Sequence, residues 1–276
     1  MPLPDFLIIG AQKAGTTWLR AMLRRHPDVY MPDRELHFFN KDRTYQRGLD
    51  WYSRQFRGAK NGHLIGEKTP NYLWTNVPAS GSDASDTHRR IAESLPDVKL
   101  LAILRNPVDR AVSAYNHHLC RGRFPPHVPM NQVLFGEYQH LCRRHGVLSM
   151  GAYAEPLHDY LELFRRDQLQ ILIFEEDVVN DPDQGIQKTC DFLNLNPDRL
   201  EAASDEARHV HSFSKARTYL NYWLPVPIAL TRPVDFFSSP WKRTPDPETR
   251  IRLQEYYAPH QEALYDLLGR RIDAWS

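Results

Sequence analysis

The sequence predicts an α/β fold in which a central, mainly parallel β-sheet lies between layers of helices, and three observations indicate it. Apolar runs of strand length occur at residues 6–9, 99–104 and 169–174, separated by segments with helical periodicity. Each run is apolar nearly throughout, which is typical of a strand buried on both faces of a parallel sheet. The first run leads through a glycine-bounded loop into a helical pattern. We therefore expect a P-loop-type three-layer α/β/α architecture.

Six helices are predicted, at residues 17–25, 87–95, 107–119, 152–166, 186–193 and 247–268. Pro27 and Pro96 end the first two, because proline cannot continue a helix. Pro107 stands at the first position of the third helix, where its missing N–H costs nothing. In the last helix we expect a break near Pro259 and a stop at Gly269.

The 276 residues suit a single domain. Its expected parts are a core at about 5–200, an irregular and candidate acceptor-facing stretch at 205–245, and a C-terminal helix at 246–276. Two regions resist assignment: residues 76–86 are small and polar, and residues 224–245 contain five prolines. Each is either a substrate-facing lid or an ordinary surface connection.

The charge balance excludes bulk attraction to nucleic acid. There are 35 Lys+Arg and 34 Asp+Glu, a formal net charge of +1, whereas such binding needs an excess of positive charge. The apolar runs are far shorter than the roughly 20 residues of a membrane helix, and the N-terminus lacks the pattern of a secretory signal. Cys120, Cys142 and Cys190 are too widely spaced for a disulfide framework or a zinc site. We expect a cytoplasmic protein with no transmembrane segment and no nucleic-acid partner.

The loop at residues 10–17 has the order of a phosphate-binding loop. It follows a strand and opens a helix, which aims consecutive backbone N–H groups and the positive helix end at one point. It departs from the Walker A pattern, because Thr16 stands where the lysine follows the second glycine, and the lysine, Lys13, lies inside the loop. The sequence therefore predicts an anion cradle with its ammonium group in an unusual place.

A second anion site is predicted at the end of the strand at 99–104. Arg105 stands where a Walker B strand would end in an aspartate, and a guanidinium cannot hold magnesium but can bind a phosphate directly. Ser113 follows two helical turns later on the predicted helix. Arg105 and Ser113 could therefore meet one phosphate from two sides, although a lone serine on a helix is more often a surface residue.

These motifs together resemble the sulfotransferases that use 3′-phosphoadenosine 5′-phosphosulfate (PAPS), in particular the heparan-sulfate-type and bacterial branch. The resemblance rests on GAQKAGTTWL at 10–19 and LRNPVDRAVSAY at 104–115, about ninety residues apart. It extends through RELHFF at 34–39, GEKTPNY at 66–72 and GAY at 151–153. There are departures: Arg34 replaces the usual lysine, Asn40 replaces an acid of some relatives, and SKAR at 214–217 matches a later cofactor-contacting loop only loosely.

The resemblance implies PAPS as sulfuryl donor, adenosine 3′,5′-bisphosphate (PAP) as product, and no metal. It implies that Lys13 contacts the leaving phosphate, that the loop with Thr16 and Thr17 holds the 5′-phosphate, and that Arg105 and Ser113 bind the 3′-phosphate. The donor-contacting residues it implies are Gly10, Gln12, Lys13, Ala14, Gly15, Thr16, Thr17, Trp18, Arg105, Ser113, Lys215 and Arg217.

The resemblance also implies the catalytic groups. Glu35 is the expected general base, His37 is the competing base, and Lys68 is expected near the sulfuryl group and the acceptor. The acceptor is expected to be a hydroxyl or amine of a carbohydrate or small molecule. The near-neutral chain favours a small or modestly charged one.

Two other functions stay open from the sequence. In a P-loop kinase, the acids that end ILIFEED at 171–177 would hold a metal ion, although the missing Walker lysine and Arg105 oppose this. A non-catalytic nucleotide-binding scaffold is the second alternative. The scattered histidines show no HxH or HExxH spacing and so indicate no metal site.

Overall fold

The computed structural model describes residues 2–78, 83–201, 213–224 and 240–275. A five-stranded sheet with the order β2-β3-β1-β4-β5 forms its centre, and every neighbouring pair of strands is parallel. Its strands are β1 (Phe6–Gly10), β2 (Val29–Tyr30), β3 (Leu64–Lys68), β4 (Lys99–Leu104) and β5 (Leu169–Ile173). The predicted α/β class and the three predicted strands are confirmed.

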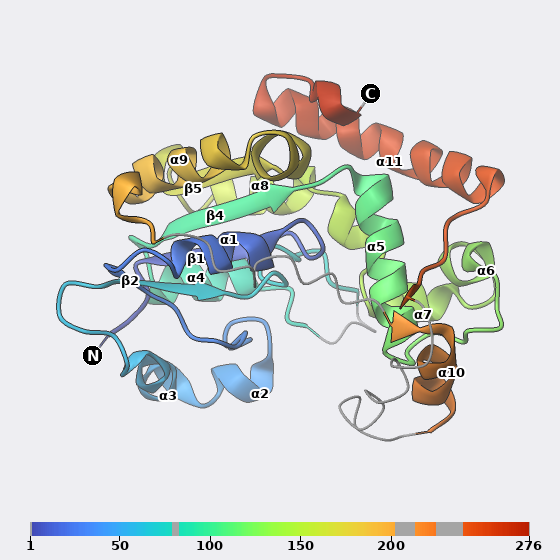
Figure 1. The fold of residues 1–276 in the computed structure, drawn as a ribbon, viewed down its shortest axis with the longest axis horizontal. Helices are drawn as coiled ribbons and strands as arrows, with labels where there is room; N and C mark the ends of the chain where they lie inside the picture. Colours follow the sequence, from blue (N-terminus) through green and yellow to red (C-terminus); the bar gives the residue numbers. More distant parts are fainter. Residues whose placement is uncertain (1, 79–82, 202–212, 225–239, 276) are drawn as a thin grey trace.

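Helices flank this sheet; in Figure 1, α8, α9 and α11 lie on one side of it and α2 and α3 on the other. The α-helices are α1 (Thr16–Leu23), α2 (Asp42–Tyr45), α3 (Gly48–Ser53), α4 (Thr87–Ser94), α5 (Pro107–Cys120), α6 (Met130–Leu134), α7 (Gln139–Arg144), α8 (Ala154–Leu161), α9 (Pro182–Leu193), α10 (Lys215–Trp223) and α11 (Pro247–Leu268). Shorter helical segments are Arg54–Phe56, Ser149–Gly151, Arg166–Gln168, Pro197–Arg199 and Asp273–Trp275, with a π-helix at Phe174–Asn180. Within the described residues, no helix combines the length and the apolar character that a membrane crossing requires.

Two predicted helices have clearly different bounds in the structure, and a third lacks its predicted break. The helix predicted at 152–166 is α8, which ends at Leu161 and is followed by a separate 3-10 turn. The helix predicted at 186–193 is α9, which begins earlier, at Pro182, because the Asp181 side chain caps it by accepting from Gln184 N at 2.9 Å. The break expected near Pro259 is wrong, since α11 runs through it. Pro259 is exposed, so water can satisfy the carbonyl that loses its helical partner.

The stretch predicted to be irregular, 205–245, contains regular structure in its described part. Helix α10 begins after Ser214, whose hydroxyl accepts from Arg217 N at 3.2 Å. Strands β6 (Phe213–Ser214) and β7 (Pro240–Trp241) pair antiparallel. Residues 202–212 and 225–239 lie outside the described residues, as do residues 79–82 of the predicted 76–86 loop. The described ends of that loop contain no helix or strand, and Ala84 O accepts from Thr87 Oγ1, at the start of α4, at 2.7 Å.

One close contact fixes the sheet where β1 meets β3. Phe6 pairs with Gly66 across the two strands, and the Phe6 ring lies where a Gly66 side chain would be. A Cβ added to Gly66 would lie 2.1 Å from Phe6 Cζ. Beside this pair, the Asp5 carboxylate accepts from Ile65 N at 2.7 Å. Glycine at this position therefore lets the central strand carry a large aromatic side chain.

We expect Gly66→Ala to lower the free energy of unfolding by about 1–3 kcal/mol, because the methyl group must displace the buried Phe6 ring. Chemical denaturation measures this change. The control is Gly62→Asn, in an exposed turn with no atom within 4 Å of an added Cβ, where Asn tolerates the positive φ. Equal stability of Gly66→Ala and the native protein would contradict the contact.

Candidate functional site

Strands β1 and β4 are neighbours in the sheet (Figure 1), and the predicted anion-binding loop and Arg105 follow their carboxyl ends. The chain leaves β1 toward β2 and β3 on one side of the sheet, and it leaves β4 toward β5 on the other. Such a switch point is where open α/β sheets bind ligands, because the diverging connections leave a crevice between them. The loop after β1 and Arg105 after β4 both lie at this point, and Arg105 Nη1 donates to Lys13 O at 3.3 Å.

The loop between β1 and α1 forms an anion cradle. Gly15, with φ 95°, precedes the helix without a side-chain cap, and no acid stands in the first helical turn. A Cβ on Gly15 would lie 2.8 Å from the Phe174 ring, so this position requires glycine. In the part of the chain that the structure describes, no acceptor is assigned to the N–H groups of Thr16 and Thr17. These groups and the helix end favour an anion.

The lysine of the loop lies among other cations. Burial lowers the pKa of Lys13, and the positive charges of Arg121, Arg105 and Lys242 lower it further. No carboxylate of the described residues forms an ion pair with Lys13. Lys13 itself therefore lacks an acidic partner among the described residues, and an anionic ligand can supply that negative charge.

Arg105 is held in place by its surroundings. Its guanidinium lies 4.8 Å from the centre of the Phe174 ring, and its carbonyl accepts from Tyr153 OH at 2.9 Å. Its buried Nε has no hydrogen-bond partner among the residues that the structure describes. Asn106 then caps α5 by accepting from Val108 N at 3.0 Å. Arg105 thus sits at a helix entry with donor capacity unused.

The remaining predicted donor-binding residues, Ser113, Lys215 and Arg217, lie on α5 and α10. Ser113 is half-buried on α5, and its hydroxyl has no hydrogen-bond partner among the described residues. Its sharing of an anion with Arg105 stays a prediction. Lys215 is exposed and Arg217 is buried in the first turn of α10, a helix that contacts α5. Their role in binding also stays a prediction.

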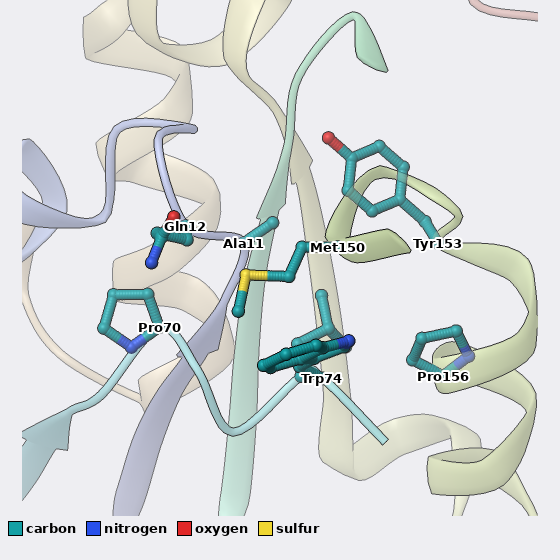
Figure 2. A pocket seen from close by; sticks show the side chains of 8 residues that line it. Ala11, Gln12, Pro70, Trp74, Met150, Tyr153 and Pro156 are labelled. Carbon is teal, nitrogen blue, oxygen red and sulfur yellow. The ribbon is translucent and has the colours of Figure 1, made fainter. Parts of the chain in front are cut away.

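Gln12 in the loop and Trp18 in α1 are two further predicted donor contacts. Gln12 lines a cavity of about 10 Å³ with Trp74 and Met150 (Figure 2), which is room for about one water molecule. The Gln12 Nε2 atom lies 3.5 Å from Asn71 Oδ1, a long contact. Trp18 is half-buried. This cavity is too small to hold a substrate.

The three predicted catalytic side chains come together. Glu35 Oε1 lies 2.6 Å from Lys68 Nζ, and Glu35 Oε2 lies 3.3 Å from His37 Nε2. Lys68 ends β3, and its Nζ also lies 3.4 Å from Thr17 Oγ1 in the first turn of α1. The predicted base therefore connects through one ammonium group to the predicted anion cradle.

The charges in this group stabilise one another. Burial alone would raise the pKa of Glu35, but the hydrogen bond with His37 and the charge of Lys68 hold it at about 2. Burial lowers the pKa of Lys68, and Glu35 offsets part of that change. Burial would also lower the pKa of His37, but the bond with Glu35 raises it instead. Glu35 is ionised at neutral pH, with one third of its side chain exposed.

The geometry separates the two candidate bases. His37 Nε2 faces Glu35, and His37 Nδ1 is buried without a partner. The Nδ1 atom is therefore shielded from solvent, whereas one third of the Glu35 side chain is exposed. The arrangement therefore favours Glu35 as the group that meets a substrate, with His37 as its support.

Sequence reasoning missed several groups around this site. Arg20 and Arg121 are close enough to Glu35 for its charge to raise their pKa, although burial dominates and lowers both. Arg20 lies on α1, directly after the loop, so its helical spacing from Thr16 could have pointed to it. Arg121 and Lys242 are brought near by the tertiary fold, and no local pattern signals them.

The chain is similar to known sulfotransferases. A family model described as a sulfotransferase domain matches residues 3–220. The human protein named heparan sulfate glucosamine 3-O-sulfotransferase 6 is 32% identical over 279 residues, covering 97% of this chain and 72% of the human one. The mouse protein of that name is 34% identical over 201 residues, covering 70% of this chain and 52% of the mouse one. A sulfotransferase structure from Alicyclobacillus acidocaldarius has a TM-score of 0.72 and 27% identity, covering 100% of this chain and 99% of that one.

In solution, His37 should titrate above the ordinary pKa of histidine, because the Glu35 carboxylate stabilises its charged form. The stability that this pair contributes is complete below the unfolded pKa of about 6.5 and is lost as pH rises through the folded pKa. Glu35→Gln should lower the pKa of His37, as measured by NMR titration of the histidine side chains. Glu162→Gln, which removes the partner of His158, is the control and should leave His37 unchanged. A His37 pKa that is unmoved by Glu35→Gln would contradict the pairing.

Proposed function

The chain belongs to the sulfotransferase domain family, and from that premise we propose that it transfers the sulfuryl group of PAPS to a hydroxyl of a carbohydrate acceptor. It is a sulfotransferase, and this family uses PAPS. The observation that carries the proposal is the contact of Lys68 with both Glu35 and Thr17. It puts a candidate base for the acceptor beside a candidate cradle for the donor.

The residues at the β1 and β4 ends fit a phosphorylated donor. When bound, PAPS supplies a phosphosulfate anhydride whose sulfuryl group is the group transferred. The N–H groups of Thr16 and Thr17, which have no hydrogen-bond acceptor among the described residues, would hold its 5′-phosphate. Gly10, Gln12, Ala14 and Gly15 of the loop and Trp18 of α1 would form the rest of this site. Lys13 would neutralise the charge that develops on that phosphate, which is the largest electrostatic demand of the reaction.

The Arg105 side would supply selectivity for the donor. Arg105 has a buried Nε without a partner, and a planar guanidinium suits a phosphate. With Ser113 it would hold the 3′-phosphate, a group that ATP lacks. Lys215 and Arg217 on α10 are further candidates for this end of the donor.

Glu35 is proposed as the base that takes the proton of the acceptor hydroxyl. A pKa of about 2 makes it a weak base in the free protein, so proton transfer must accompany bond formation to the sulfuryl group. Lys68 would remain beside the carboxylate and face the group being transferred. His37 would keep the carboxylate oriented through Nε2.

The acceptor is proposed to be a carbohydrate that carries negative charge. The human and mouse relatives named above are glucosamine 3-O-sulfotransferases that act on heparan sulfate. In this chain, Arg20, Arg121 and Lys242 lie near the site. Among the described residues, no carboxylate forms an ion pair with Arg121 or Lys242. The net charge of +1 suggested a modestly charged acceptor, but the local excess of cations favours an anionic one.

The acids that a kinase would need for metal binding already bind other groups of the protein. The acids after β5 are Glu175, Glu176 and Asp177, and each is already bound to another group. Their partners are Asn106 N and Trp275 Nε1 for Glu175, Arg270 for Glu176, and Ile173 N and Lys188 for Asp177. All of these contacts tie the π-helix to its neighbours. The scaffold alternative is disfavoured because Glu35 pairs with Lys68, which in turn contacts Thr17 at the end of the loop that carries Lys13.

PAP should stabilise the protein in a thermal-shift assay, because a ligand stabilises in proportion to its affinity for the native state. Arg105→Met should weaken PAP binding about tenfold or more while leaving adenosine 5′-monophosphate, which lacks the 3′-phosphate, unaffected. Lys13→Ala should weaken both nucleotides. The control is Arg271→Met, which removes a distant surface ion pair. Stabilisation by ATP with Mg²⁺ alone would contradict the proposal.

Glu35→Gln should lower kcat for transfer from radiolabelled PAPS by about 10²–10⁴-fold, the usual contribution of a general base. PAP affinity should stay within a few-fold of the native value, since Glu35 does not touch the loop. A panel of carbohydrate acceptors, sulfated and unsulfated, is assayed in parallel with Glu162→Gln as the control. An unimpaired Glu35→Gln enzyme would move the base role to His37.

A further inference from the structure

A fully buried carboxylate lies behind the candidate base. Glu67 precedes Lys68 on β3, and its side chain is 0% exposed. Three hydroxyl groups donate to it: Tyr52 OH at 2.6 Å, Thr69 Oγ1 at 2.6 Å and Tyr72 OH at 3.0 Å. In the described parts of the chain, no cation forms an ion pair with Glu67. The carboxylate is thus held by hydroxyls alone.

Two of these hydroxyls also support the segment that carries Glu35. Thr69 Oγ1 accepts from His37 N at 3.3 Å, and Tyr72 OH accepts from Phe38 N at 3.0 Å. A hydroxyl has one proton, so a hydroxyl that donates to Glu67 turns its lone pairs elsewhere. Here they face two backbone N–H groups.

The segment needs such support because its backbone is in an unfavourable conformation. His37 has φ 50°, a left-handed value that is costly for a residue with a side chain and persists only where the surroundings hold it. This turn directs the His37 Nε2 atom at Glu35. It also places the Phe38 ring 4.3 Å from the Tyr52 ring in a stacked arrangement.

Lys68 and Glu67 therefore act on the same segment from one strand. Neighbouring side chains of a strand point to opposite faces. Here Lys68 pairs with Glu35 directly, while Glu67 binds the Thr69 and Tyr72 hydroxyls that accept from His37 N and Phe38 N. Burial raises the pKa of Glu67, and the three hydroxyl groups oppose that change. The carboxylate form is the one that can accept from all three at once.

We propose that the Glu67 side chain is a positioning group that aims the Thr69 and Tyr72 hydroxyls at the backbone of residues 37–38 and thereby holds Glu35 in its working place. This inference rests on the proposed function of Glu35 as base. Glu67 touches neither donor nor acceptor, and it acts only through the two hydroxyls.

The chain offers a matched pair of variants for the test. Tyr52→Phe and Tyr72→Phe each remove one hydroxyl that donates to Glu67, and each keeps a buried ring. Only Tyr72→Phe also removes an acceptor for the segment. Thr69→Val removes the other acceptor, and Thr69→Ser restores it. Melting temperatures measured for all four separate general stability from positioning.

The first measurement is amide hydrogen exchange at His37 and Phe38 by NMR. Tyr72→Phe should speed exchange at Phe38 and Thr69→Val at His37, each about tenfold or more, while Tyr52→Phe and Thr69→Ser should leave both amides near the native rate. Faster exchange in Tyr52→Phe by the same factor as in Tyr72→Phe would overturn the inference, and so would unchanged exchange in all variants. This measurement needs no activity.

The second measurement is transfer from PAPS. Tyr72→Phe and Thr69→Val should lower kcat about tenfold or more, since a small misplacement of a catalytic group is costly, with the KM for PAPS unchanged. Tyr52→Phe and Thr69→Ser should retain kcat within about threefold. Equal losses in Tyr52→Phe and Tyr72→Phe would overturn the inference. A native protein that transfers nothing, while the exchange rates behave as expected, would instead overturn the proposed function.

Discussion

The candidate site depends on one constraint, which is that three adjacent strands of a parallel sheet end at the same edge. Strands β3, β1 and β4 are neighbours, and each delivers a cation there: Lys68 ends β3, Lys13 follows β1 and Arg105 follows β4. Neighbouring strands lie about 4.8 Å apart, so three charges far apart in sequence meet within a space the size of a small ligand. A slip of register in any strand would move its cation to the wrong face or depth.

Glu35 is the part of the site that the sheet does not carry. It lies in a segment without helix or strand, and contacts with the end of β3 hold it in place. Lys68 holds the side chain, while Thr69 and Tyr72, beyond the strand, hold the backbone. A loop can carry a catalytic group accurately when a rigid element fixes it at more than one point.

Elements with a local sequence signal could be predicted, whereas contacts between distant segments could not. Strands β1, β4 and β5 are apolar runs and were predicted, whereas β3 carries Gly66, Glu67 and Lys68 and does not read as a buried strand. The GEKTPNY motif lies there and marks the segment as part of the site. The contacts of Glu67 with Tyr52, Thr69 and Tyr72, however, form only in the folded chain. Helix α10 was missed because the prolines that follow it dominate the pattern of that region. The pairing of Glu35 with Lys68 spans 33 positions, and no periodicity indicates it.

The cations around Lys13 have a consequence for the protein before it meets a ligand. Burial and the positive charges of Arg121, Arg105 and Lys242 lower the pKa of Lys13, so the fold brings like charges together around this lysine. An anion that enters relieves this repulsion in addition to forming its own bonds. Binding of an anion in the cradle and the folding equilibrium are therefore thermodynamically linked.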